Sequence, residues 1–450
     1  MRPSEVLADR YHLQLSQRWR DWFDCAADQV QPRGALRHCV SVDLLKAEAP
    51  EAIWAGFMLP DTLPIVGNEY GDWICVRVEA NGCLGELVYW YHGGGDWIPV
   101  GDRLAEALLH DAIDLFRPDY HQPLRGAGES LAELARPQTA DLQCETWRNW
   151  LIDQLSDASR SGAQVRAAIS TIHDQLADGK HEHAVALLQE FGWAKFAAAC
   201  DLIEYCLRNP VRALAQPSVA ERCGIVWYPD FVEMLFDVDL VPRDMRQQLS
   251  HAAGLDTHAW PRQDWERACR IATAVLSQRD DLGWAFAIAG WGQERQREFR
   301  QAVDIYHRGR LATSFSDQSV RLGYHATTES LCKFTIAQLQ GLRKYMREDQ
   351  AADWYLQTYF RPHRRSLLHE VSQAWQERAA RQFAEGRFAE AYDSFYRAGW
   401  DLGVSRLGEY APILEAMVAS AERAGSDARA EVARTHLRRL IGQSRPSSGA

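Results

Sequence analysis

The pair of histidines at 181 and 183 is the strongest candidate for metal chemistry in this 450-residue chain. His181 and His183 flank Glu182 in a segment with helical periodicity. Side chains two residues apart on a helix point about 200° apart, so these two imidazoles cannot bind one metal ion. The spacing therefore predicts no metal site at this position.

Other catalytic motifs are also missing from the sequence. No HExxH, GxSxG or CxxC occurs, and Gly93–Gly95 is not followed by the lysine and helix start of a phosphate-binding loop. Glu79 and Glu86 flank a turn and are most simply solvated. The closest pair among the ten cysteines, Cys200 and Cys206, lies inside a helical pattern, which indicates buried free thiols. We expect no enzyme, with no catalytic residues, no cofactor and no bound metal.

Negative charge is concentrated in the first third of the chain. Residues 1–135 hold 11 Lys and Arg against 21 Asp and Glu, and the remaining residues hold 39 against 40. Such a field repels nucleic acid and attracts basic proteins, mainly by raising association rates. We therefore expect a protein partner and no nucleic acid. The alternative is that this charge serves solubility alone.

The chain has no segment typical of membrane insertion or secretion. No run approaches the roughly 18 apolar residues that a membrane span needs. Residues 1–22 are interrupted by charges and lack the apolar region of a signal peptide. These patterns predict a cytoplasmic protein with no membrane partner.

The residues between 10 and 118 predict a small sheet flanked by helices. Residues 10–29 are amphipathic and predict a helix, whereas Trp73–Val78 and Leu87–His92 alternate like strands. Asn81-Gly82 supplies the turn between these strands. Asp102 can cap the next helix, which runs to Pro118.

Composition divides the chain into two expected domains. We predict an α+β domain with a small antiparallel sheet over 1–120, a linker over 121–140, a larger all-α domain over 141–440 and a disordered tail over 441–450. Three segments of the all-α part resemble tetratricopeptide hairpins, but their alanines are not spaced at multiples of about 34 residues. A degenerate helical-repeat domain is therefore expected. The alanines that align are Ala184, Ala302 and Ala391.

The sheet segment resembles the SUKH superfamily of fungal cell-wall-synthesis regulators and bacterial immunity proteins. The resemblance follows Leu59-Pro60, Gly71-Asp72 before a strand, Gly85, a second strand ending in Trp90 and His92, and a helix from about Asp102. It covers about 60 residues, or about 110 with the N-terminal helix. It implies a protein-binding domain without catalysis, whose bacterial partner is often a secreted toxin.

The candidate partner-binding residues lie at or next to the ends of these strands. They are Asp72, Trp90, His92, Asp96 and Trp97. Asp72 either faces a partner or caps a turn, Trp90 fits the core best, and His92 is a contact or a plain surface histidine. Trp97 is the best candidate for an exposed anchor, with a core position as the alternative.

Two functions from different classes remain after these steps. The first is an immunity protein whose acidic domain blocks a basic toxin. The second is a scaffold or regulator whose helical repeats assemble other proteins, with the sheet domain as an accessory. The sequence does not fix the oligomeric state.

Overall fold

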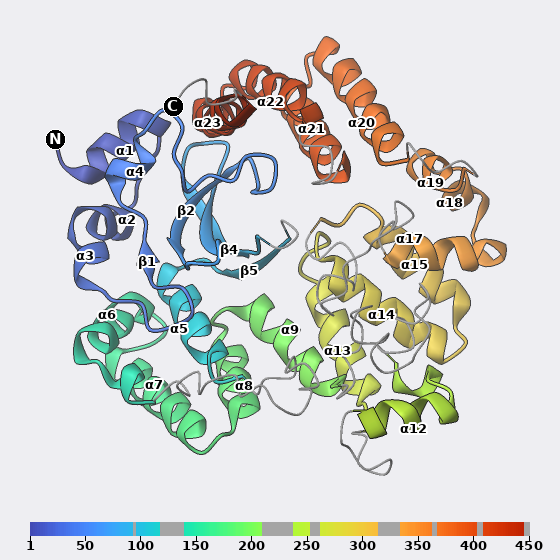
Figure 1. Ribbon diagram of the computed structural model, residues 1–450, viewed down its shortest axis with the longest axis horizontal. Coiled ribbons are helices and arrows are strands. Elements are labelled where there is room, and N and C mark those ends of the chain that lie inside the picture. Colours follow the sequence, from blue (N-terminus) through green and yellow to red (C-terminus); the bar gives the residue numbers. More distant parts are fainter. Residues whose placement is uncertain are drawn as a thin grey trace. The chain divides into compact units, whose positions relative to one another are not determined.

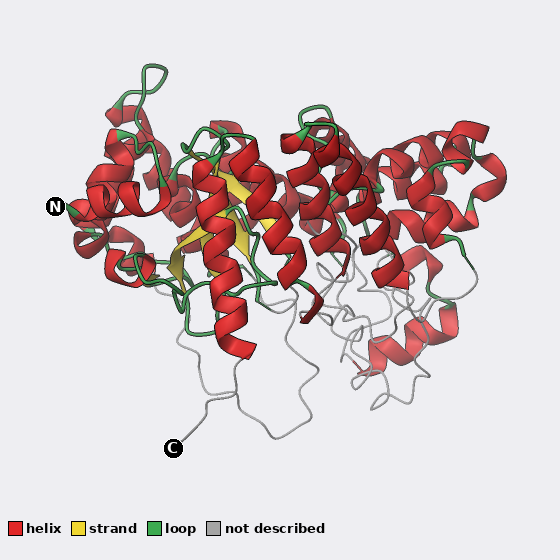
Figure 2. Cartoon of the chain, turned by 90° about the horizontal axis from the view of Figure 1, so that it is seen from above, coloured by secondary structure: helices red, strands yellow, loops and turns green. Residues whose placement is uncertain are grey.

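The computed structural model describes residues 1–92, 96–117, 139–208, 237–252, 262–313, 334–361, 367–402 and 408–444. In these residues a five-stranded antiparallel sheet near the N-terminus is followed by a large helical region (Figure 1; Figure 2). The predicted fold class is confirmed. Most of the expected linker lies outside the described residues, and so does most of the tail. No described helix combines the length and the apolar character needed to cross a bilayer.

The chain divides into two compact units that differ from the expected domains. The first unit contains Met1–Leu115, Thr139–Asp174 and Arg361–Ala450, and the second contains Phe116–Gln138 and Gln175–Phe360. The expected boundary at 121–140 assigned all later helices to one domain. The structure instead groups the last helices with the sheet, and their contacts with it give the physical reason.

The sheet has a simple sequential order, and one of its strands matches the predicted bounds. β3 covers the predicted residues, whereas β4 begins before Leu87. β2 was missed because Pro64 looks like a turn residue; it lacks an N–H, and the register shifts between Pro64 and Val66. Gly82 forms the β3–β4 turn with φ +81°. The strands, in order across the sheet, are β1 (His38–Cys39), β2 (Thr62–Gly67), β3 (Trp73–Val78), β4 (Leu84–Trp90) and β5 (Trp97–Gly101).

Helices of the first unit come from both ends of the chain. The prediction of one helix over 10–29 is wrong, because His12 is left-handed at φ 53° and the next residues leave the helix. There the Gln14 N–H donates to the Gly82 carbonyl at 2.9 Å, which ties the segment to the sheet. The N-terminal helices are α1 (Pro3–Tyr11), α2 (Gln17–Asp21), a π-helix (Trp22–Ala26), α3 (Ala27–Gln29) and α4 (Val42–Leu45).

Helix α5 (Leu104–Asp114) covers one face of the sheet, where it contacts β4 and β5. Its N-cap residue is Arg103, not Asp102 as expected, and Arg103 makes no side-chain cap bond. α5 also contacts α6 (Glu145–Leu155). A 3₁₀ turn (Thr139–Gln143) precedes α6, and α7 (Gly162–Ala177) follows it.

Two of the C-terminal helices, α21 (Phe388–Leu402) and α23 (Asp427–Ser444), pack against the sheet on the side away from α5 (Figure 1). Tyr396 and Trp400 pack against the core cluster that contains Cys75 of β3. Ser426 and Arg429 donate to backbone carbonyls of the β3–β4 hairpin at 2.9 and 3.0 Å. The sheet is therefore completed by residues more than 300 positions away. The C-terminal helices are α20 (Leu367–Ala384), α21 (Phe388–Leu402), α22 (Ala411–Arg423) and α23 (Asp427–Ser444).

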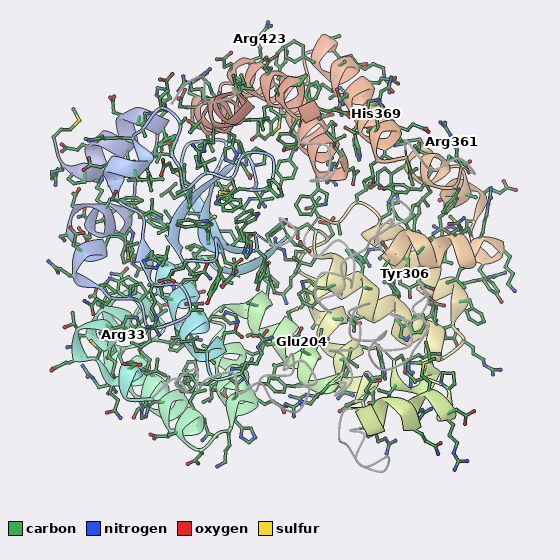
Figure 3. All side chains as sticks on the ribbon, in the orientation of Figure 1. Arg33, Glu204, Tyr306, Arg361, His369 and Arg423 are labelled. Atoms are coloured by element: carbon green, nitrogen blue, oxygen red, sulfur yellow. The ribbon has the colours of Figure 1, made fainter. Side chains whose placement is uncertain are left out.

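The second unit is helical throughout its described residues. Successive helices pack in pairs, α8 on α9, α13 on α14 and α14 on α15. Tyr306, labelled in Figure 3, is fully buried and lies where a side chain at Gly290 would stand. Its helices are α8 (His181–Phe191), α9 (Lys195–Cys206), α12 (Arg243–Ala252), α13 (Trp265–Leu276), α14 (Gly283–Arg295), α15 (Phe299–Gly309), α17 (Phe334–Gly341), α18 (Glu348–Ala351) and α19 (Trp354–Tyr359), with 3₁₀ turns at Val238–Leu240 and Arg343–Tyr345.

Two of the three segments with tetratricopeptide-like spacing form packed helix pairs. The clearest pair is α20 with α21, joined at Gly386, which has φ +78°. The buried small residues Ala379 and Ala391 let these two helices approach closely. The second segment forms the packed pair of α14 and α15, and the third covers parts of the successive helices α7 and α8.

Candidate functional site

The five predicted site residues lie at one end of the sheet. Trp90 at the end of β4 pairs with Trp73 of β3 on one side and with Trp97 of β5 on the other. Asp72 immediately precedes β3, and His92 follows β4. The sheet register therefore brings together residues that the sequence separates by up to 25 positions.

Trp90 and Trp97 belong to the core at this sheet end. Both have 0% exposed surface. The indole N–H of Trp90 donates to the Phe57 carbonyl at 3.0 Å, and the Arg77 guanidinium lies 5.4 Å from the centre of the Trp97 ring. The core position expected for Trp90 is confirmed. The expectation of an exposed anchor at Trp97 is wrong, because its ring is enclosed by the partly buried aromatic residues that cover the sheet.

The Asp72 carboxylate is used inside the molecule. One of its oxygens accepts the backbone N–H of His92 at 3.0 Å and lies 2.8 Å from Nδ1 of the same residue. The other oxygen accepts from the Asn68 amide at 3.2 Å. Asp72 was expected either to face a partner or to cap a turn. These contacts fit a structural role, because the carboxylate accepts a backbone N–H of the chain itself. It also fixes the orientation of the His92 ring, whose side chain is 40% exposed.

Asp96 is a structural residue of the segment that enters β5. Its side chain is 2% exposed and accepts the Trp97 N–H at 2.8 Å. Its carbonyl accepts the Tyr91 N–H at 2.9 Å. Asp96 therefore closes the connection between β4 and β5. Gly93–Gly95, the predicted break in the ladder, lies outside the described residues.

Two exposed aromatic side chains at this sheet end were missed by the sequence argument. Trp54 is 39% exposed and Tyr70 is 75% exposed. A side chain at Gly71, where φ is +95°, would stand 3.0 Å from the Trp54 ring and 3.5 Å from the Cβ of His92. Gly71 thus lets Trp54 and His92 meet beside Tyr70. We call Trp54, Tyr70 and His92 the aromatic rim.

The Trp54 ring is held in place by other rings. Its centre lies 6.0 Å from that of Trp90, 6.5 Å from that of Phe57 and 6.3 Å from that of His92. The edge-to-face geometry with Phe57, at 89°, is a favourable aromatic arrangement. A short turn of sequence, NEYGD at 68–72, could have signalled the rim, because its glycine needs a positive φ between two polar turn residues.

The sequence around the rim is strongly acidic. Residues 51–100 contain one Lys or Arg and seven Asp or Glu. That one cation, Arg77, is bound to Asp61 at 2.7 Å, and Asp61 is almost fully buried. Glu69 has an 84% exposed side chain, with His38 at 3.9 Å. Among the acidic residues of this segment, Glu69 therefore reaches solvent next to Tyr70, whereas Asp61 and Asp96 are almost fully buried.

A second polar centre lies beneath the C-terminal helices, away from solvent. His436 of α23 is 0% exposed, and burial lowers its pKa to about 4. The Asp61 carboxylate opposes this effect and also raises the pKa of the buried Tyr392. We assign this centre to the packing of α23 on the sheet unit, because none of these side chains reaches solvent.

The groups exposed at the rim are suited to contact with another molecule. A histidine oriented by a carboxylate can serve as a general base, but no described hydroxyl or thiol bonds to His92. No cluster of three potential metal ligands occurs among the described residues. His181 lies on α8, is 3% exposed and contacts the Tyr205 hydroxyl. The exposed groups here are the fixed Trp54 indole, the Tyr70 phenol and the carboxylate of the adjacent Glu69.

No family model matches the chain, and neither a curated protein nor a solved structure matches it. The resemblance to the SUKH superfamily therefore stays a prediction from the sequence motifs. A function for the chain has to be argued from the charge and the exposed side chains of the sheet end.

Proposed function

We propose that the protein is a non-catalytic, cytoplasmic binding protein of the immunity type, which binds a basic toxin and blocks it. The observation that carries the proposal is the aromatic rim, two exposed aromatic rings in a segment with seven acidic residues and one basic residue. The resemblance to SUKH immunity proteins supports the same class of partner.

Exposed aromatic side chains support binding because of their energetics. Tyr and Trp are enriched among the few interface residues that carry most of the binding free energy. Large exposed hydrophobic side chains are few among the described residues, namely Met1, Trp54, Tyr70, Leu240 and Ile441. Of these, Trp54 and Tyr70 lie on either side of Gly71, since Tyr70 precedes it in the chain and the Trp54 ring lies against it. Their burial by a partner removes apolar surface from water at a preformed site.

The acidic segment supports a basic partner for a separate reason. Negative charge spread over an open surface raises the encounter rate with a positively charged protein. Secreted toxins that act on nucleic acid need basic surfaces to approach phosphates. A protein that blocks such a toxin therefore benefits from a surface of the opposite sign.

The test is site-specific photo-crosslinking in the native cell. A benzophenone amino acid replaces Tyr70 in one variant and Ile441, which is 43% exposed, in the control variant. We expect one basic protein to be captured at position 70 and not at 441. Expression of that protein alone should arrest growth, and coexpression of the full chain should restore it. Equal capture at both positions, or no effect on growth, would contradict the proposal.

The scaffold hypothesis has support of its own, but in the second unit. Tetratricopeptide-like hairpins bind partners on a concave face. The inner side of α21 and α23 is covered by the chain's own sheet, through Tyr396, Trp400, Ser426 and Arg429. A scaffold surface would therefore involve α8, α9 and α13–α15. Partner binding that survives Tyr70→Ala and Trp54→Ala but not changes on those helices would favour it.

A further inference from the structure

We infer that the aromatic rim recognises an arginine side chain of the partner, stacked on the Trp54 ring beside the Tyr70 turn and paired with the Glu69 carboxylate of that turn. The inference rests on the proposed function and names the chemical group that the rim takes. It concerns the same side chains, but it can fail while partner binding at the sheet end stands.

The first argument is the geometry of the rings. Trp54 is fixed by Phe57, Trp90 and His92, yet 39% of its surface stays open. Tyr70 is bonded through its backbone N–H to the Asn68 side chain at 3.0 Å, so the turn that carries its ring is defined. Binding to the Trp54 ring, which is already held in place, loses little conformational entropy.

The second argument is charge. Aromatic faces attract cations through the ring quadrupole, and most strongly in the case of Trp. Both Asp72 oxygens already accept hydrogen bonds, whereas Glu69 is 84% exposed beside Tyr70. An apolar side chain placed on the rim would desolvate Glu69 without compensation. A cation removes that cost by pairing with it.

The third argument comes from the other tryptophans of the chain. The guanidinium of an arginine lies over the ring of Trp97 at 5.4 Å, of Trp265 at 5.1 Å and of Trp375 at 5.7 Å. In the part of the chain that the structure describes, no arginine or lysine lies over Trp54 or Tyr70. Trp54 is thus an indole of the same kind with no cation over its ring among the described residues, and 39% of its surface is exposed.

Arginine fits this site better than lysine. Its planar guanidinium stacks on rings and donates to a carboxylate from its edge at the same time. Lysine carries a compact, strongly hydrated charge that gains less from a flat ring. We therefore propose arginine as the bound side chain, and the test compares it with lysine.

The probe is a short capped peptide, Gly-Arg-Gly-Arg-Gly, titrated into the full chain labelled with 5-fluorotryptophan. The chain has 17 tryptophans, so the ¹⁹F signal of Trp54 is assigned by its loss in Trp54→Phe. We expect a saturable shift of this signal with the arginine peptide. Binding should be at least fivefold weaker for the neutral citrulline peptide and at least twofold weaker for the lysine peptide.

Variants separate the rim from general charge attraction. Tyr70→Ala and Glu69→Gln should each weaken peptide binding at least threefold. The control is Glu48→Gln, which removes the same charge from a side chain that is also 84% exposed, and it should change binding less than 1.5-fold. Equal weakening by Glu48→Gln and Glu69→Gln would overturn the inference, and so would equal binding of arginine and citrulline peptides.

The same variants distinguish this failure from failure of the proposed function. If Tyr70→Ala weakens binding of the crosslinked partner while arginine and citrulline peptides bind equally, the rim binds the partner through other groups. In that case the proposed function stands and the arginine inference is wrong. If Tyr70→Ala and Trp54→Phe leave partner affinity unchanged, the rim is not the binding surface, and both are wrong.

Discussion

Side chains at the end of the sheet fall into two groups at the residue scale. Trp90 and Trp97 are fully buried and fix the sheet against α21, whereas Trp54 and Tyr70 reach solvent from the loops before β2 and β3. Residues of the first group should affect stability, and residues of the second should affect binding. Substitutions at matched aromatic positions test this division.

Trp97→Ala should strongly destabilise the first unit. Removing a large buried ring leaves a cavity and costs about 3–5 kcal/mol of unfolding free energy. Tyr70→Ala removes an exposed side chain, and we expect a change within about 0.5 kcal/mol. Denaturant unfolding of both full-length variants measures the difference. A Trp97→Ala protein as stable as the Tyr70→Ala protein would show that the ring at 97 is not a core residue.

Asp111 of α5 should make stability fall as the pH rises from about 4 to 7. Burial raises the pKa of its carboxyl to about 7, partly opposed by the bond from the Leu36 N–H at 2.9 Å. Between about pH 4 and 7 the folded state thus keeps a proton on Asp111 that the unfolded state has released. The contribution of Asp111 to the unfolding free energy is therefore complete below pH 4 and is lost as the pH rises through 7.

Asp111→Asn removes this titration and keeps an acceptor for Leu36. The unfolding free energy of the variant minus that of the natural chain should rise by about 2–4 kcal/mol as the pH goes from 4 to 8. Denaturant unfolding at several pH values gives this difference. A difference that does not change with pH would mean that the carboxyl titrates normally.

His436 of α23 should act in the opposite direction. Burial lowers its pKa to about 4, so the unfolded state binds a proton first as the pH falls below about 6.5. Its contribution is therefore present above pH 6.5 and lost by about pH 4. In His436→Leu this loss disappears, and the stability difference from the natural chain should shift by about 1.4 kcal/mol per pH unit in that range. Parallel stability curves down to pH 4.5 would contradict this.

The C-terminal helices are, at the element scale, part of the sheet unit. Arg429 of α23 bonds the Val78 carbonyl and lies 3.6 Å from Glu79, and Glu431 forms an ion pair with Arg10 of α1. Tyr396 and Trp400 of α21 cover the buried rings of the sheet. These contacts join the two ends of the chain into one core.

Truncation after residue 402 should therefore weaken the sheet. Without α22 and α23, the carbonyls of Val78 and Ala80 and the buried side chain of Asp61 become exposed to water. Hydrogen exchange should show faster exchange of the backbone N–H groups in β2, β3 and β4. The control is truncation after Ser444, which keeps all described helices. Unchanged protection after truncation at 402 would mean that the sheet folds independently of these helices.

Local pattern predicted some elements well and could not predict others. The alternation in WICVRV gave β3 with its correct ends, and Gly386 gave the turn between α20 and α21. β2 was not predicted, because proline is disfavoured inside a sheet. The structure accommodates Pro64 by a register shift between β2 and β3. The pairing of α21 and α23 with the sheet leaves no local signal, because it depends on contacts across more than 300 residues.

The same limit applies to the binding site. Asp72, Trp90, His92, Asp96 and Trp97 could be placed near strand ends from the sequence, and the sheet brings them to one end. Their exposure could not be predicted, because the side chains that cover Trp97 come from α21. Trp54 escaped notice because its contact with His92 depends on Gly71, 17 residues later.

At the scale of the whole molecule, the uneven distribution of charge is the property that most narrows the class of partner. The segment 51–100 is acidic, and its one cation is bound to a buried carboxylate. In the proposed complex, charge of this kind would act mainly on the encounter with the partner, and the rings of the rim would act on how long the complex lasts. The account therefore assigns association to the acidic segment and dissociation to Trp54 and Tyr70.

The most direct test of this central claim is a salt series of association and dissociation rates with the protein crosslinked at position 70. The Debye length falls from about 10 Å at 0.1 M salt to about 3 Å at 1 M, so steering should be lost across this range. We predict that association slows at least fivefold while dissociation changes less than twofold, and that Tyr70→Ala accelerates dissociation alone. An association rate that stays constant across the series would contradict the account, because the acidic charge would then serve solubility and not recognition.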